Sequence, residues 1–418
     1  MPDWMGTSAT VQKALRLISQ GALDRGGVDD LAAQVGIGSR HLRRLFIRHV
    51  GAGPLQIAQT RRLHFAKKLI DETSLSMTQV AFNAGYSSLR RFNTAFRATF
   101  QCAPTELRRS SSNNRSNSSK DLVGDNCWLQ FRLPFRPPFA WESLLGFLNY
   151  RAIAGVEAVV DDCYRRTIEV DGATGVIEVK RSSRPNELQL RVNVSETERL
   201  LHVVERIRTI FDLSCDPLQV RDWLGSQPML SRLIKATPGL RVPGCWDGFE
   251  LAVRAILGQQ ITVKAATTLA GRVATAFGTA LRSSPFENLQ VLSPKPIDLI
   301  DADLENCGVI SSRANAIRQL AREVHVGEIC FDSAMTTPEL CRRLCDIKGI
   351  GQWTADYICM RALQEPDAFP SSDLVLRKNA STDGTPITAK QMDKLAEPWR
   401  AYAAVHLWSA TLNKDLKE

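Results

Sequence analysis

The sequence predicts a multidomain chain with three different kinds of fold. At 418 residues it is too long for one ordinary core. Apolar residues recur with a helical period near both ends of the chain but alternate with period two in between. We expect an all-α double helix-turn-helix domain over residues 9–109, a flexible Ser/Asn-rich linker over 110–126, an α+β lobe with an antiparallel sheet over 127–211 and an all-α helix-hairpin-helix domain over 212–418.

The composition is that of a water-soluble globular chain, with 44% hydrophobic and 23% charged residues. There is no apolar run of membrane-spanning length and no basic-then-apolar signal at the start, so we expect a cytoplasmic protein, associated with the nucleoid. The ten Cys form no C-x-x-C pair, and only Cys341 and Cys345 lie one helical turn apart. Free thiols are therefore favoured over a metal site or disulfides.

The positive charge is concentrated at the N-terminal end. Residues 1–120 hold 18 Lys and Arg against 7 Asp and Glu, which gives +11, whereas the whole chain carries +9. Such an asymmetry indicates a nucleic-acid-binding module in the N-terminal part.

Two helix-turn-helix units are predicted there. In the first, a helix over 28–36 ends at Gly, and Ser39 is expected to cap a helix over 40–49 that turns Leu42, Leu45 and Phe46 inward. The second unit repeats this arrangement over 77–97, with Leu89, Phe92 and Phe96 inward. A helix over 55–70, about 24 Å long at ~1.5 Å per residue, would hold the two recognition helices in successive major grooves, about 34 Å apart.

Arginines occupy the outward faces of both recognition helices. On a single helix such arginines would indicate only a solvated surface. Two such helices, in a segment with a net charge of +11, favour DNA binding. The second unit, from Ala81-x-x-Ala-Gly-Tyr-Ser-Ser through Phe92, Phe96 and Ala103-Pro104, resembles the DNA-binding domain of AraC-type transcription regulators. Duplex DNA is thus an expected partner and RNA polymerase a further one, with expected DNA contacts at Ser39, Arg40, Arg43, Arg44, Ser87, Arg90 and Arg91.

The middle segment predicts a small antiparallel sheet flanked by helices. Residues 129–133, 164–170, 175–180 and 188–194 alternate between apolar and polar, and helix signals cover 140–149 and 196–211. None of these segments carries a catalytic pattern, so we expect a structural role.

A Gly-Ile-Gly turn dominates the C-terminal part. Thr337-Pro338 opens a helix that ends near Asp346, Gly349 and Gly351 bracket Ile350, and a second helix runs from Gln352 to about 363. The amides of such a turn and of the next helix N-terminus form a site sized for phosphate. A lone Gly-x-Gly is weak evidence, and an ordinary helical turn is the alternative.

The surrounding residues decide between these interpretations. Gly349-Ile-Gly-Gln-Trp-Thr-Ala355, followed by Asp373 22 residues after Gly351, resembles the helix-hairpin-helix DNA glycosylase superfamily, and within it the 3-methyladenine DNA glycosylase II branch. The resemblance covers about residues 127–412 and includes blocks at 238–245, 249–260 and 398–408. It implies DNA binding by Gly349, Ile350 and Gly351, a monovalent cation on the hairpin carbonyls, and no other cofactor or metal.

The resemblance also assigns the catalytic residues. Asp373 would stabilise the sugar cation and orient water, although Ser-Ser-Asp before an apolar run is equally a helix N-cap, and both roles can coexist. Trp353, Tyr357 and Trp408 would line the base pocket, where aromatic faces attract a cationic alkylpurine by ~0.5–2 kcal/mol, whereas Trp399 is expected in the core. Gln260 stands at the position of an apolar duplex wedge.

One position predicts the reaction type. Relatives that also cut the strand carry a Schiff-base Lys two residues after the second hairpin Gly, where this chain has Trp353. Hydrolysis of the glycosidic bond without lyase activity is therefore expected. No Cys follows Cys359, which excludes the four-Cys iron–sulfur cluster of some relatives.

The fusion of these two parts resembles adaptive-response regulators of alkylation damage without their zinc methyl-acceptor domain. No Cys precedes Cys102 and no Pro-Cys-His-Arg stretch occurs, so methyl transfer to this chain is not expected. The expectation is a monomeric alkylbase glycosylase with a regulator's DNA-binding domain. The alternative is a transcription regulator whose glycosylase half is an inactive DNA-binding platform.

Overall fold

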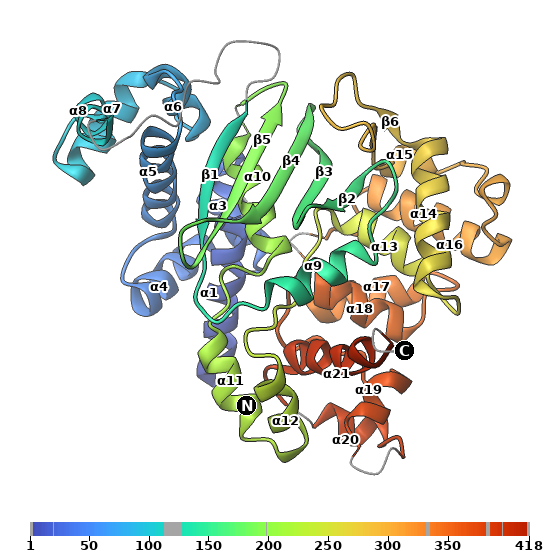
Figure 1. Cartoon of the computed structure of the whole chain (residues 1–418). Helices are drawn as coiled ribbons and strands as arrows, with labels where there is room; N and C mark the ends of the chain where they lie inside the picture. The colour runs from blue at the N-terminus through green and yellow to red at the C-terminus, as the bar shows by residue number, and fades with distance from the viewer. Residues whose placement is uncertain are drawn as a thin grey trace.

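The computed structural model describes residues 3–19, 21–112, 128–197, 199–331, 335–381, 385–394 and 396–415. Eight helices at the left of Figure 1 form the N-terminal domain, a five-stranded sheet occupies the middle, and the remaining helices lie to the right and below. This arrangement confirms the predicted fold class. The predicted linker falls almost entirely on residues outside the described ones.

The N-terminal domain contains both predicted helix-turn-helix units. Its helices are α1 (Asp3–Ser19), α2 (Ala22–Arg25), α3 (Val28–Gln34), α4 (Ser39–Val50), α5 (Pro54–Glu72), α6 (Met77–Asn83), α7 (Leu89–Phe100) and α8 (Pro104–Ser112). The recognition helices are α4 and α7, and α5 joins the two units. On α7 Phe92 and Phe96 are buried as expected, but the expectation that Leu89 faces inward is wrong: it is the first residue of the helix and is exposed.

The two recognition helices begin differently. The expectation that Ser39 caps α4 is wrong: Gly38 is the N-cap residue, without a side-chain hydrogen bond, and Ser39 is the first helical residue. In α7, by contrast, the Ser88 hydroxyl accepts a hydrogen bond from the Arg91 amide at 3.3 Å. Glycine is an acceptable N-cap that leaves the first amides to solvent, so Gly38 and Ser39 were both plausible N-cap residues.

The second helix-turn-helix unit shares its core with the sheet. Leu69, Ile70 and Phe92 belong to the same buried cluster as Phe131 of the sheet, whereas the first unit has a separate core. At this contact the Glu72 carboxylate pairs with Lys68 at 3.0 Å and with Arg132 at 3.3 Å. The second unit is therefore docked on the middle lobe rather than standing as an independent module.

The sheet is antiparallel throughout, with strand order β1-β5-β4-β3-β2. One face of it is covered by α10 (Figure 1). The short edge strand β2 was not expected, and α10 begins four residues later than predicted. The strands and helices of this lobe are β1 (Leu129–Pro134), α9 (Trp141–Asn149), β2 (Glu157–Val160), β3 (Cys163–Val170), β4 (Ala173–Arg181), β5 (Glu187–Val194) and α10 (Leu200–Ile210).

The C-terminal helices enclose the largest buried cluster of the described chain, which includes Ile256, Leu344 and Ile358. Among the described helices none is long and apolar enough to cross a membrane. The elements are α11 (Pro217–Gly225), α12 (Pro228–Ala236), α13 (Gly248–Leu257), α14 (Val263–Phe277), β6 (Thr279–Ala280), β7 (Val291–Leu292), α15 (Pro296–Leu299), η1 (Glu305–Cys307), α16 (Ser311–His325), α17 (Thr337–Asp346), α18 (Gln352–Ala362), α19 (Leu374–Asn379), α20 (Ala389–Asp393) and α21 (Arg400–Asp415).

The cysteines agree with the expectation of free thiols. Nine of them lie among the described residues, and none of these nine forms a disulfide. Within the same residues no group of three or more His, Cys, Asp or Glu side chains is placed to hold a metal ion.

Candidate active site

The predicted hairpin lies between α17 and α18. The Ile350 amide donates to the Ile347 carbonyl at 3.0 Å, and the Ile350 side chain is buried in the core. Gly349 has a φ of +102°, which L side chains rarely adopt, and Gly351 is the N-cap of α18. Gly351 and Gln352 are exposed, so the N-terminus of α18 lies at the surface, which is a favourable site for a phosphate.

Asp373 is held by two hydrogen bonds. As the N-cap of α19, its Oδ1 accepts from the Leu376 amide at 2.8 Å. Its Oδ2 accepts from the Trp353 indole Nε1 at 2.8 Å. Each carboxylate oxygen has a further lone pair, so the fixed side chain still has acceptor capacity for a water or a developing positive charge.

Three aromatic side chains come together beside this carboxylate. Trp353 and Tyr357, one turn apart on α18, stack with ring centroids 5.5 Å apart and an interplanar angle of 5°. Trp408 of α21 lies edge-on to Tyr357 at 6.1 Å. The structure thus brings together Asp373 and the three residues expected to line a base pocket. Trp399 is half-buried against the core and lies edge-on to Tyr402.

Beneath the three aromatic rings lies a buried arginine, Arg361, with its hydrogen-bond partners. It was not predicted from the sequence. Arg361 donates to the Tyr357 hydroxyl at 2.7 Å and, at 2.8 Å each, to the carbonyls of Pro243 and Gly244. Burial opposes ionisation of the phenol, but the charges of Arg361 and its neighbours outweigh it, so the pKa of Tyr357 lies below its ordinary value. The available signal was an Arg that follows the apolar run Ile358-Cys-Met360 within α18.

Arg151 belongs to the same network. Its guanidinium lies over the Phe147 ring, 3.8 Å from the centroid, and its positive charge also lowers the pKa of Tyr357. Phe147 and Arg151 are one helical turn apart at the end of α9, so the middle lobe contributes to the pocket region. This lobe is therefore more than a packing partner for the catalytic helices.

The loop after α13 is tied directly to the hairpin. The Gln259 side-chain amide donates to the Gly349 carbonyl at 2.9 Å and to the Thr354 hydroxyl at 3.1 Å. The Arg313 guanidinium in turn donates to the Gln259 carbonyl. Gln260, the residue after Gln259, is exposed and has a left-handed φ of +55°.

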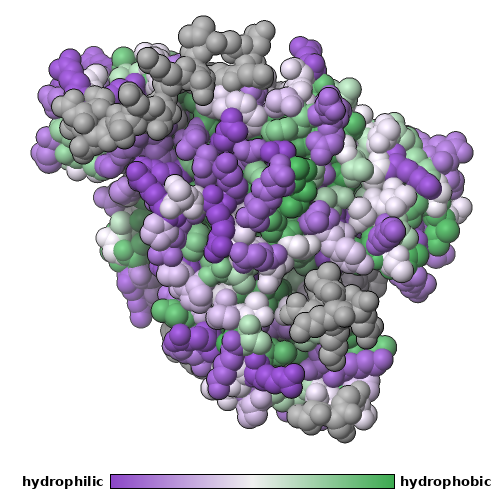
Figure 2. Space-filling view, in the orientation of Figure 1, coloured by the Kyte–Doolittle hydropathy of each residue, from purple (hydrophilic) through white to green (hydrophobic). Residues whose placement is uncertain are grey.

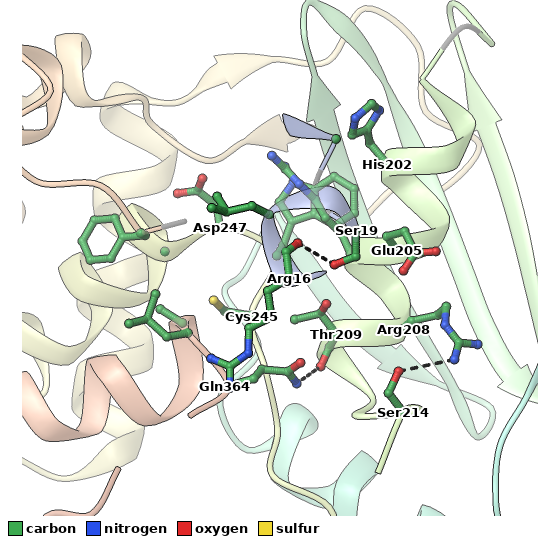
Figure 3. Close-up of a pocket in the computed structure, with 18 of the residues that line it drawn as sticks. Arg16, Ser19, His202, Glu205, Arg208, Thr209, Ser214, Cys245, Asp247 and Gln364 are labelled. Carbon is green, nitrogen blue, oxygen red and sulfur yellow. Dashed lines mark hydrogen bonds between the residues drawn. The ribbon is translucent and has the colours of Figure 1, made fainter. Parts of the chain in front are cut away.

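A wide cavity of about 1390 Å³ lies elsewhere, between the N-terminal domain and the glycosylase half. Figure 3 shows Arg16 of α1 near Gln364, whose side-chain amide donates to the Thr209 carbonyl. Arg16 also pairs with Glu365 at 3.2 Å. Asp373 and the aromatic cluster do not line this cavity, so it is a gap between domains and not the base pocket.

The N-terminal recognition helices present their basic residues outward. The expected contact residues Arg40, Arg43 and Arg44 on α4 are exposed, as are Arg90 and Arg91 on α7. Ser39 is half-buried, and Ser87 is exposed just before α7. Many hydrophilic side chains lie on the left side of the molecule in Figure 2, among hydrophobic ones.

Family models match all three parts of the chain. A helix-turn-helix domain model matches residues 31–110, the AlkA N-terminal domain model matches 130–247, and the HhH-GPD superfamily model of base excision DNA repair proteins matches 253–401. Fold and site together define a helix-hairpin-helix DNA glycosylase fused to an AraC-type DNA-binding domain.

The similarity to individual curated proteins identifies the family within this class. The chain is 36% identical over 411 residues, 98% of its own length and 82% of the relative's, to the "Probable bifunctional transcriptional activator/DNA repair enzyme AlkA" of Mycobacterium tuberculosis. It is 33% identical over 281 residues to "DNA-3-methyladenine glycosylase 2" of Escherichia coli, covering 66% of this chain and 96% of that protein. The chain belongs to the AlkA family of 3-methyladenine DNA glycosylases, in its form fused to a regulator domain.

A solved structure agrees on the fold. The 3-methyladenine DNA glycosylase from Archaeoglobus fulgidus superimposes with a TM-score of 0.59 at 21% identity, covering 66% of this chain and 96% of that one. At this identity the likeness concerns the fold alone.

Proposed function

We propose that the chain hydrolyses the N-glycosidic bond of alkylated purines of the 3-methyladenine and 7-methylguanine type in duplex DNA. The observation that carries this proposal is the 2.8 Å hydrogen bond between Trp353 and Asp373, which places a carboxylate beside an aromatic cluster. The damaged nucleotide would leave the stack to reach this site.

Different residues would carry out the separate steps of base excision. Gly349, Ile350 and Gly351, with the N-terminus of α18, would hold a backbone phosphate. Trp353, Tyr357 and Trp408 would enclose the extruded base, and their electron-rich faces favour a positively charged purine. Such a base is a good leaving group, so the main requirement is an anion near the anomeric carbon. Asp373 would supply it and orient the attacking water.

The arginine network below Tyr357 bears on this choice of substrate. Positive charge there would repel a cationic base, but the Arg361 guanidinium is already directed at the Tyr357 hydroxyl and at two backbone carbonyls. The attraction for the cationic base would therefore come from the faces of the aromatic rings. Arg361 would fix the orientation of Tyr357 through its hydrogen bond to the hydroxyl.

We infer that the enzyme has no lyase activity, because Trp353 stands where a Schiff base requires Lys. A monovalent cation on the hairpin carbonyls is part of the proposal. The Gly349 carbonyl accepts one hydrogen bond, from Gln259, and keeps a second lone pair, which would be one ligand of such an ion. The ion would add positive charge next to the bound phosphate. No other cofactor is invoked.

For the N-terminal domain we infer sequence-specific duplex binding through α4 and α7, in a monomer acting in the cytoplasm on the nucleoid, with RNA polymerase as a possible further partner. Contacts would come from Ser39, Arg40, Arg43, Arg44, Ser87, Arg90 and Arg91. A transcription regulator with an inactive glycosylase half is the second candidate, favoured only by the presence of this domain.

Release of free methylated base from methylated duplex DNA separates the two candidates. The enzyme releases base in a time-dependent manner, whereas the inactive platform binds the duplex and releases none.

A further inference from the structure

Gln260 is in an unusual position for a glutamine. Its backbone has a φ of +55°, a left-handed conformation that is costly for a residue with a Cβ. Its side chain is exposed, and within the described part of the chain the amide has no hydrogen-bond partner. No contact within the described chain compensates for this conformational cost. The side chain is therefore a candidate for contact with a bound molecule.

The loop that carries Gln260 is fixed relative to the DNA-binding hairpin. Gln259 donates from one side-chain nitrogen to both the Gly349 carbonyl and the Thr354 hydroxyl, and Arg313 holds the Gln259 carbonyl. Gln260 therefore projects from a loop whose position is set by the same turn that would hold the phosphate. A side chain in this position is presented to the duplex whenever the hairpin binds it.

The chemistry of the side chain determines what it can do there. Extrusion of a purine leaves a gap and an orphaned pyrimidine whose donor and acceptor groups have lost their partners. An apolar side chain fills such a gap without pairing. A primary amide has both a donor and an acceptor, and it can satisfy the N4–H and N3 of cytosine or the N3–H and O4 of thymine.

We propose that Gln260 enters the gap and hydrogen-bonds the pairing edge of the orphaned pyrimidine, so that the enzyme reads the base opposite the lesion. This inference rests on the proposed glycosylase function and adds to it a specificity-determining residue. An orphan without a pairing edge gives the amide nothing to bind.

Binding to product-like DNA tests this without catalysis. The full chain is titrated with three duplexes that carry a tetrahydrofuran abasic site opposite C, opposite T, or opposite a second tetrahydrofuran. We expect wild type to bind the first two about 10-fold more tightly than the third, in line with the energy of a bidentate base contact. Gln260→Leu removes the amide but leaves an apolar side chain that can fill the gap, and it should bind all three alike, whereas Gln260→Asn, which retains the amide, should keep part of the preference.

Gln219, exposed on α11, provides the matched control, since Gln219→Leu should behave as wild type. Equal unfolding midpoints for the variants exclude a folding defect. Equal binding of all three duplexes by wild type, or an unchanged preference in Gln260→Leu, overturns the proposal. Excision of 7-methylguanine opposite C or opposite tetrahydrofuran adds a second readout. No excision from either duplex contradicts the glycosylase function, whereas excision at equal rates contradicts the role of Gln260 alone.

Discussion

The Trp353 indole donates a hydrogen bond to the Asp373 carboxylate over 2.8 Å. This contact joins α18, which carries Trp353 and Tyr357, to the N-terminus of α19, between residues 20 positions apart in the chain. It fixes the side chain of Asp373 together with the Leu376 amide at 2.8 Å. The same tryptophan thus belongs to the expected base pocket and orients the carboxylate that we propose as the catalyst.

Trp353→Phe separates these two roles. Phenylalanine retains a ring that can stack on Tyr357 but lacks the Nε1 donor. A hydrogen bond to a charged group contributes about 1.5–3 kcal/mol, so we expect the single-turnover excision rate to fall by about 10- to 100-fold. Trp223, whose Nε1 donates to the Glu397 carbonyl far along the chain, is the control. If Trp353→Phe excises at the rate of Trp223→Phe, the indole does not orient the catalyst.

The product of excision should be an intact strand with an abasic site. Since Trp353 replaces the Schiff-base Lys, borohydride added during turnover should trap no covalent protein–DNA complex. Gel electrophoresis under denaturing conditions measures both outcomes. A borohydride-dependent adduct would show that another amine acts as nucleophile.

Operator recognition is predicted to depend on one arginine from each recognition helix. Arg43→Ala and Arg91→Ala should each weaken binding of a selected duplex by about 1–3 kcal/mol if the side chain contacts a base edge. Arg184→Ala, which removes an exposed arginine from the middle lobe, is the control. The full chain is needed, because the second helix-turn-helix unit buries Leu69 and Ile70 in a core shared with the sheet.

Binding-site selection from a random pool, followed by titration at several salt concentrations, measures this. Each neutralised phosphate should add roughly −0.9 to the log–log slope. If no sequence motif is selected, the N-terminal domain binds DNA without sequence preference and only holds the glycosylase half on the duplex.

A buried carboxylate should make stability depend on pH. Burial raises the pKa of Asp212 to about 6, and the Tyr402 hydroxyl donates to it at 2.9 Å. Because the folded pKa lies above the unfolded one, near ~3.9, this contribution is fully present below about pH 4 and is lost as pH rises through about 6.

The unfolding free energy of wild type relative to Asp212→Asn should therefore decline from pH 4.5 to pH 7, by on the order of 2 kcal/mol. Denaturant titrations at the two pH values test this sign. A difference that grows with pH would mean that the folded state favours the carboxylate.

Local chemistry explains which parts of the site could be predicted from the sequence. The glycines of the hairpin and the capping role of Asp373 depend on nearby residues, and the structure confirms both. The proximity of Trp408 came from the family resemblance. The Arg361 contacts to Pro243 and Gly244 join residues more than 100 positions apart, and no local pattern encodes such a partner.

The same reason applies to the fold. Alternating strands and helix stripes were visible, but β2 is only four residues long and half-buried throughout, so it shows no alternation. The shared core between α5 and the sheet depends on which apolar stripes meet in space, since Leu69 and Ile70 would serve equally well inside an independent helical domain.

The central claim is that Asp373 catalyses the release of methylated purines. Asparagine is as good an N-cap as aspartate, so Asp373→Asn should preserve α19 while removing the negative charge. The decisive measurement is the time course of base release from methylated duplex DNA by wild type and by Asp373→Asn, with binding to the same duplex measured in parallel. We expect release by wild type, and a loss of at least about 100-fold in the variant with binding largely retained. Equal release by the two proteins, or none by wild type, would contradict it.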